Sequence, residues 1–232
     1  GAYIIGTGSK PESVEWMHEE HGIEGHAIDV RDREAMNNLF NGVVRKRKKV
    51  DCLINNAGIG QHGKIIDMPF EVEKKIMDIN FYGQILLTKT ILPDFLQRKS
   101  GAIITISSIV GKFGSPYLGI YSASKHALQG YFESLREEVY DQGIDVHLVY
   151  PGFINTEVTL NSLTTEGKPL KKNSKAQEKG MSPSIFAKKL RQKVEAGKKS
   201  FLIGKWEIYS VYLKSAFPSM FFWLMRKMSK KN

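Results

Sequence analysis

The stretch Gly101-Ala102-Ile103-Ile104-Thr105-Ile106-Ser107-Ser108 is the strongest guide to the fold. Its β-branched residues predict a buried strand over 102–106, which ends where two serines offer hydroxyl groups for a turn. Similar short apolar runs occur at 2–5, 26–28, 50–54, 145–150 and 201–203. Helical periodicity separates them, at 13–21, 33–47, 70–96, 121–140 and 184–196. Apolar strands separated by helices indicate an α/β fold with a doubly wound, mostly parallel sheet covered on both faces.

The composition fits a single domain of this kind. The chain has 232 residues, of which 41% are hydrophobic and 25% are charged, as is usual for globular proteins. Cys52 is the only cysteine, which excludes an internal disulfide and predicts a reducing, cytoplasmic location. No run of roughly 18 apolar residues is present, so we expect no simple membrane-spanning helix.

Charge is distributed unevenly along the chain. Residues 1–167 carry 17 basic and 21 acidic side chains, a net charge of −4, whereas residues 168–232 carry 17 basic and 3 acidic ones, a net charge of +14. A basic segment can face phosphate ligands, nucleic acid or anionic lipid, or it can be a solvated surface. Because no recognised nucleic-acid-binding motif is present, we expect no nucleic-acid partner.

Tyr121-Ser122-Ala123-Ser124-Lys125 is the segment with the clearest chemical meaning. On a helix, Tyr121 and Lys125 share one face because they are four residues apart. A free phenol has a pKa of about 10, and a nearby ammonium group can lower it toward the range of a general acid/base. Ser108 precedes Tyr121 by 13 residues. A parallel sheet places both hydroxyls at its carboxyl edge, where they can bind one substrate oxygen.

In these residues the sequence resembles the short-chain dehydrogenase/reductase family. The matching elements occur in the order and spacing of the family, from about residue 1 to about residue 160. They are Asp29-Val30, Asn55-Asn56-Ala57-Gly58, Asn80, Ser108, Tyr121 with Lys125, and Pro151-Gly152-Phe153-Ile154-Asn155-Thr156. The resemblance implies a Rossmann-like fold and hydride transfer between a nicotinamide cofactor and a ketone or secondary alcohol, without a metal.

The resemblance also implies a role for each matching residue. Tyr121 would be the general acid/base, and Lys125 would lower its pKa and bind the nicotinamide ribose. Ser108 would orient the substrate oxygen, and Asn80 would hold a water molecule in a proton relay. The cofactor cleft would be lined by Asp29 and Val30 beside the adenine, by Asn56, Ala57 and Gly58 in the turn, and by Pro151, Gly152, Ile154 and Thr156 at the nicotinamide amide.

The chain departs from the family at its beginning. Only two strands precede Asn55, where the family has three, and Pro11 stands where the third glycine of a dinucleotide fingerprint belongs. We therefore hypothesise that the natural protein carries a first β-α unit ahead of Gly1, with the glycine-rich turn that holds the pyrophosphate. The alternative is a pseudoenzyme or scaffold that kept the fold and lost the phosphate-binding turn.

The sequence indicates which cofactor is preferred if Gly6-Thr7 ends the strand that corresponds to the second strand of family members. An acidic residue there would bind the adenosine ribose and repel a 2′-phosphate. The sequence instead offers Thr7, Ser9 and Lys10. These residues favour NADP(H) over NAD(H).

The second half of the domain is expected to select the substrate. Phe113, Tyr117 and Phe153 are expected near Ser108 and Tyr121, and aromatic lining favours a lipophilic ketone or alcohol, although core packing explains aromatic residues equally well. We interpret the polar, lysine-rich segment 157–183 as a lid within a domain that spans residues 1–204. By family analogy, the helices at 70–96 and 121–140 predict a homodimer or homotetramer.

Residues 205–232 form an aromatic, basic extension, similar to the ends of hydroxysteroid-dehydrogenase-like proteins. Two interpretations remain open. The extension packs on the core or across a dimer, or residues 206–228 make a peripheral contact with an anionic lipid surface, so that the cytoplasmic protein is membrane-associated.

Overall fold

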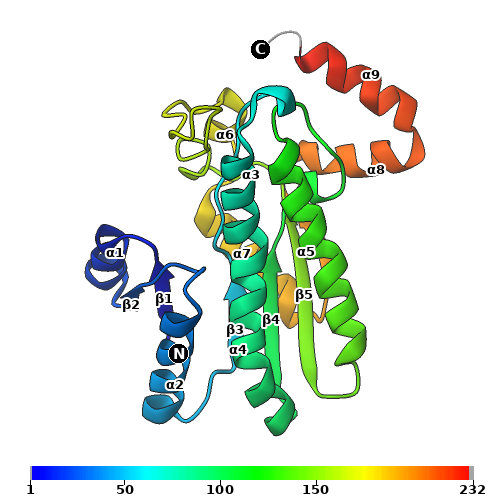
Figure 1. Ribbon diagram of the computed structural model, residues 1–232. Coiled ribbons are helices and arrows are strands. Elements are labelled where there is room, and N and C mark those ends of the chain that lie inside the picture. The colour runs from blue at the N-terminus through cyan, green and yellow to red at the C-terminus, as the bar shows by residue number, and fades with distance from the viewer. Residues whose placement is uncertain (1, 230–232) are drawn as a thin grey trace.

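The strands pair in parallel throughout the computed structural model, which describes residues 2–229 (Figure 1). The larger sheet has the order β3-β4-β5-β6, and a separate pair joins β1 and β2. The strands are β1 (Ile5–Gly8), β2 (Glu24–Ala27), β3 (Cys52–Asn55), β4 (Gly101–Ile106), β5 (Ile144–Pro151) and β6 (Ser200–Ile203). The expected α/β fold with parallel strands is confirmed, and the sheet is divided between β1 and β3.

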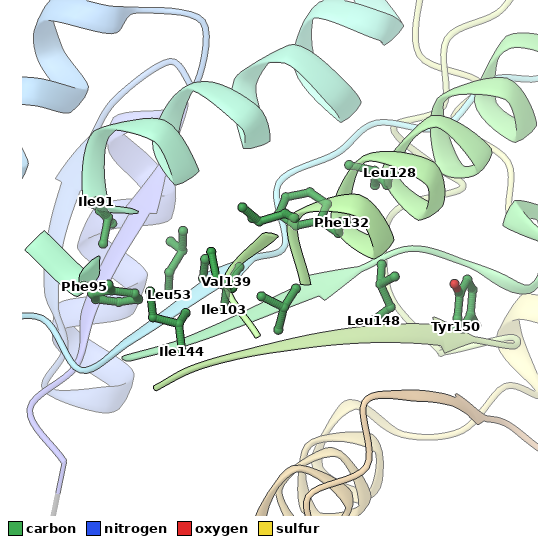
Figure 2. Packing of buried hydrophobic residues seen from close by; sticks show 12 residues of the cluster. Leu53, Ile91, Phe95, Ile103, Leu128, Phe132, Val139, Ile144, Leu148 and Tyr150 are labelled. Carbon is green, nitrogen blue, oxygen red and sulfur yellow. The ribbon is translucent and has the colours of Figure 1, made fainter. Parts of the chain in front are cut away.

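Helices cover both faces of the larger sheet. α4 (Gly83–Arg98) and α5 (Gly119–Glu138) pack on one face, where Phe95 and Phe132 are fully buried (Figure 2). α7 (Pro183–Glu195) packs on the other face. Each such aromatic side chain contributes about 1.5–3 kcal/mol by leaving water. This arrangement fixes the carboxyl ends of β3, β4 and β5, where the candidate site lies.

The prediction for the first strand was wrong by three residues. A strand was expected over 2–5 with its end at Gly6, whereas β1 has Gly6 and Gly8 inside it. The reason is close packing by α1 (Pro11–His21), because a Cβ on Gly6 would lie only 2.5 Å from the Met17 sulfur. Glycine at this position therefore lets the Met17 side chain pack directly on the strand, although its intrinsic preference is against strands.

The long helical pattern at 70–96 corresponds to two helices and a turn between them. α3 (Phe70–Met77) leads into a π-helical turn over Asp78–Tyr82 and then into α4. A π-helical turn adds a residue to the turn and is frequent at functional sites. Here it places Asn80 on the inner side of the helix, where the side chain is fully buried.

The remaining helices connect and flank these layers. α2 (Arg33–Arg47) has the predicted bounds, and segment 157–183 contains the short α6 (Lys175–Glu178). Short 3-10 turns also occur, namely η1 (Ile65–Asp67), η3 (Ile109–Gly111) and η4 (Trp206–Ile208). The C-terminal extension forms α8 (Tyr209–Ala216) and α9 (Pro218–Ser229). Across residues 2–229, every helix is too short or too polar to cross a lipid bilayer.

Candidate active site

Ser108, Tyr121 and Lys125 meet at the carboxyl end of β4. Ser108 follows this strand and caps the turn η3, where its Oγ accepts a hydrogen bond from the Val110 backbone N–H at 3.3 Å. Tyr121 lies in the first turn of α5, and its phenol shares a hydrogen bond with the Ser108 side chain. The structure therefore brings together the two hydroxyl groups that the sequence analysis placed on one substrate oxygen.

The Lys125 ammonium is held inside the protein. The residue is only 4% exposed, and its Nζ donates to the Ile106 carbonyl oxygen at 2.9 Å and lies 5.8 Å from the centre of the Tyr121 ring. Burial lowers the pKa of Lys125 to about 8. Within residues 2–229, the Ile106 carbonyl oxygen is the only hydrogen-bond partner of the Lys125 ammonium. An ammonium has three donors, so two remain for a ligand.

The electrostatic role expected of Lys125 is not what this geometry shows. The sequence analysis predicted that Lys125 lowers the pKa of Tyr121. Burial instead raises the pKa of the Tyr121 phenol above its ordinary value, and the hydrogen bond with Ser108 opposes that rise. The Lys125 ammonium, which donates to the Ile106 carbonyl oxygen, is not among the groups that shift the pKa of this phenol. The phenol is therefore fully protonated at neutral pH.

Asn80 connects the π-helical turn to the loop after β3. Its Oδ1 accepts from the Ile59 N–H at 2.8 Å, and its Nδ2 donates to the Ile59 carbonyl at 2.9 Å and to Ser124 Oγ at 3.2 Å. Both amide hydrogens are thus used, and one lone pair of Oδ1 stays available for a water molecule. A Cβ on Gly58 would lie 3.3 Å from Asn80 Oδ1 and 3.6 Å from Lys125 Nζ. Glycine therefore keeps the strand tip open beside these two groups.

Buried polar side chains support this region from below. Ser107 Oγ donates to the Lys125 carbonyl oxygen at 2.9 Å, which ties the end of β4 to α5. Asn55 Nδ2 donates to Thr88 Oγ1 at 2.9 Å, and Gln84 Nε2 donates to the Ala57 carbonyl at 2.8 Å. These bonds fix the ends of β3 and β4 relative to α4 and α5.

The predicted cofactor residues lie on both parts of the divided sheet. Asn56, Ala57 and Gly58 follow β3, while Pro151, Gly152, Ile154 and Thr156 belong to the end of β5 and the loop after it. Asp29 makes a two-pronged ion pair with Arg31, which lowers the pKa of its carboxyl group. Val30 packs closely on Gly83, at the start of α4.

The predicted end of the cofactor strand needs correction. Thr7 was placed at the strand end, but it lies inside β1 opposite His26. Gly8 is the last residue of the strand, and the exposed Ser9 and Lys10 follow it. Ser9 and Lys10 are thus the polar side chains directly beyond this strand.

The loop after β5 is held by side chains from far along the chain. Glu207 is 5% exposed and accepts hydrogen bonds from the backbone N–H groups of Phe153 and Lys205, each at 3.0 Å. Gln177, from segment 157–183, donates to the Ile154 carbonyl. Neither residue belongs to a motif, and the sequence analysis missed both.

The three predicted substrate aromatics have different surroundings. Phe113 is buried in an edge-on contact with Phe221 of α9, at 4.9 Å between ring centres, so it is a packing residue and not a free wall of the site. Tyr117 stacks on His62 at 5.5 Å. Phe153 is exposed at the loop that Glu207 holds. The core-packing interpretation therefore holds for Phe113.

Gln61 is a further site residue that the sequence analysis missed. It is fully buried, and its Oε1 accepts from the Tyr121 backbone N–H at 3.2 Å. The first N–H groups of a helix have no partner within the helix, so this bond caps α5 at the residue that carries the phenol. A glutamine in a loop gives no signal of such a role in the sequence.

The residues around Lys125 fit the nicotinamide side of a dinucleotide. Two buried donors of Lys125 and the open backbone at Gly58 suit a ribose with two hydroxyl groups. The pyrophosphate side differs, because β1 is followed by Ser9, Lys10 and then Pro11, the first residue of α1, and not by a glycine-rich turn. Within residues 2–229, the fit therefore covers the nicotinamide end of the cofactor.

Comparisons with known proteins agree with this geometry. Residues 1–167 match the family model described as short chain dehydrogenase. A dehydrogenase/reductase SDR family member 7B from Xenopus laevis is 36% identical over 216 residues, which cover 93% of this chain and 66% of that protein. The chain spans about two thirds of the length of the curated relatives it matches.

Solved structures have the same fold. A short-chain dehydrogenase from Streptomyces avermitilis superposes with a TM-score of 0.80 at 24% identity, over 100% of this chain and 89% of that one. ElxO with NADP bound superposes with a TM-score of 0.64 at 31% identity, over 67% of this chain and 65% of that one.

Proposed function

Because this chain belongs to the short-chain dehydrogenase/reductase family, we propose that it is an NADP(H)-dependent oxidoreductase that interconverts a lipophilic ketone and a secondary alcohol. The observation that carries the proposal is the Tyr121 phenol hydrogen-bonded to Ser108, with the buried ammonium of Lys125 one helical turn away. Support for NADP(H) comes from Ser9 and Lys10 beyond β1, and from the NADP bound in the similar structure of ElxO.

Tyr121 and Ser108 are proposed to bind the substrate oxygen together. The bound nicotinamide supplies or accepts a hydride at the substrate carbon. As the carbonyl is reduced, Tyr121 donates its phenol proton to the substrate oxygen, while Ser108 keeps that oxygen in line by a hydrogen bond. The two remaining donors of the Lys125 ammonium hold the nicotinamide ribose.

Burial of the phenol favours carbonyl reduction at neutral pH. Since burial raises the pKa of Tyr121, the phenol carries the proton that reduction consumes. Oxidation of an alcohol needs the phenolate, so its rate is expected to increase with pH. The remaining lone pair of Asn80 Oδ1 is a suitable acceptor for the water that replaces the lost proton.

The test is NADPH oxidation with a panel of lipophilic ketones. Tyr121→Phe is expected to lower kcat/KM by about 10²- to 10⁴-fold, the usual contribution of a general acid. NADPH binding, followed by fluorescence titration, should change little. Tyr140→Phe is the matched control, because Tyr140 is exposed in the turn that follows α5, at the end away from Tyr121. Equal loss in both variants, or full activity in Tyr121→Phe, contradicts the proposal.

The divided sheet supports a second candidate, a scaffold that has the family fold without cofactor turnover. The two candidates differ in NADPH binding. Fluorescence titration should be made on the chain of residues 1–232 and on the protein purified from its natural source, whose intact mass is measured in parallel. Binding and turnover by the natural protein support the enzyme, and absence of both supports the scaffold.

A further inference from the structure

The C-terminal hairpin, defined here as residues 206–229, is anchored to the domain by one face only. Phe221 is 2% exposed and packs edge-on against Phe113. Val211, Leu213 and Met225 join the same apolar cluster. α8 and α9 pack against each other and project from the body, so that α9 extends away from the sheet (Figure 1). The hairpin thus has a buried side with a defined partner.

The hairpin also carries many large apolar side chains in contact with solvent. Trp206 is 71% exposed and Trp223 is 49% exposed. The further exposed members are Tyr209, Tyr212, Phe217, Met220, Phe222, Leu224 and Met228. Single exposed apolar residues are ordinary, but nine of them within one helical hairpin indicate an interaction surface.

The charge around these side chains has only one sign. Residues 208–232 contain five Lys or Arg residues and no Asp or Glu. Lys227 Nζ lies 4.0 Å from the centre of the Trp223 ring, so positive charge adjoins the aromatic surface directly. Glu207, the last acidic residue, is buried in the loop after β5. The surface therefore suits an anionic partner.

A second copy of the hairpin is a poor partner for this surface. A two-fold dimer places the same patch on both sides of the interface, so like charges would meet without a carboxylate between them. Tryptophan and tyrosine with lysine and arginine are instead the residues that settle at the boundary between lipid headgroups and acyl chains. α8 has 8 residues and α9 has 12, fewer than the roughly 20 that a membrane-spanning helix needs.

We propose that the C-terminal hairpin docks the protein on the surface of an anionic lipid bilayer. The aromatic side chains enter the interface, and Arg226 and Lys227 contact the headgroups. The apolar cluster that anchors Phe221 also contains Leu118 and Tyr121, so the docked surface adjoins the candidate active site. Delivery of a lipophilic substrate from the bilayer rests on the proposed function, whereas docking does not, because it needs neither cofactor nor turnover.

Vesicle flotation of the chain without cofactor tests the docking. The protein is expected to float with phosphatidylcholine vesicles that contain phosphatidylserine, and not with phosphatidylcholine alone. Each basic residue near an anionic surface contributes about fivefold to binding, so the double variant Arg226→Gln, Lys227→Gln should bind about 25-fold more weakly. The matched control is Lys188→Gln, Lys189→Gln, which removes the same charge from the exposed face of α7. Equal weakening by both pairs shows general electrostatic attraction and overturns the proposal, as does the absence of flotation.

Tryptophan fluorescence locates the contact. A protein that keeps only Trp223 should shift its emission to shorter wavelength with anionic vesicles. A protein that keeps only Trp16, in α1 on the opposite side of the molecule, should not shift (Figure 1). If Trp223 responds to protein concentration instead of lipid, and sedimentation shows a dimer, the surface joins two copies and the proposal is wrong.

Discussion

Lys125→Met removes a positive charge that the fold holds almost entirely out of water. Burial moves the pKa of this ammonium from 10.5 to about 8, which corresponds to a cost of about 3 kcal/mol while the group stays charged. Because the folded pKa lies below the unfolded one, the unfolded chain holds more protons between these two values. The free energy of unfolding therefore increases with pH across this window.

The Lys125→Met variant lacks this pH dependence of the free energy of unfolding, so a comparison with the natural chain measures it. For these two pKa values, Lys125 alone should raise the free energy of unfolding by about 2 kcal/mol between about pH 7 and about pH 9.5. Urea unfolding of the natural chain and of Lys125→Met at both pH values gives this contribution, since other titrating groups are common to both proteins. Lys89→Met, which changes an exposed lysine of α4, should keep the dependence of the natural chain. If the pH dependences of Lys125→Met and of the natural chain agree within about 0.5 kcal/mol, the Lys125 ammonium is hydrated and the reasoning fails.

Three further outcomes are expected. Carbonyl reduction by the natural protein should fall as pH rises through about 8, because Lys125 loses its proton there, and a kcat/KM profile that stays flat to higher pH would contradict this assignment. Glu207→Leu should lower the free energy of unfolding by about 2–4 kcal/mol in urea titrations, because the backbone N–H groups of Phe153 and Lys205 lose their charged acceptor. Glu207→Gln keeps an acceptor oxygen and should lower the free energy of unfolding much less. Equal losses in the two variants would show that side-chain packing, and not these hydrogen bonds, accounts for the effect. Lys10→Glu should reverse the preference between NADPH and NADH in kcat/KM, and an unchanged ratio would place the 2′-phosphate elsewhere.

Elements with both periodicity and an end signal could be located from the sequence. α2 has the predicted bounds because Asp32 caps its first turn, where the side chain accepts from the Ala35 N–H at 3.0 Å, and basic residues close its last turn. The strands β4 and β5 contain near-continuous apolar runs, at 102–104 and 148–151, which identify them without knowledge of their partners. The order of Ser108, Tyr121 and Lys125 was likewise sufficient to predict that they meet.

Features that depend on contacts between distant segments could not be predicted. The π-helical turn interrupts the pattern at 70–96 because Asn80 bonds to the Ile59 backbone, and hydrophobic periodicity carries no trace of that bond. β1 contains glycines because α1 lies close to it. The direction of the Lys125 ammonium depends on the Ile106 carbonyl at the strand end, which no helical spacing reveals.

The loop at Gln61 connects the first turn of α5 to the segment around Leu163. The Gln61 side chain caps α5, while its neighbours Gly60 and His62 exchange backbone hydrogen bonds with Leu163 at 3.0 Å and 2.9 Å. A shift of the segment around Leu163 would therefore pull on the amide that supports the phenol. A substrate that rearranges this segment would move the backbone of Tyr121, the proposed proton donor, through residues 60–62 alone, without any movement of the sheet.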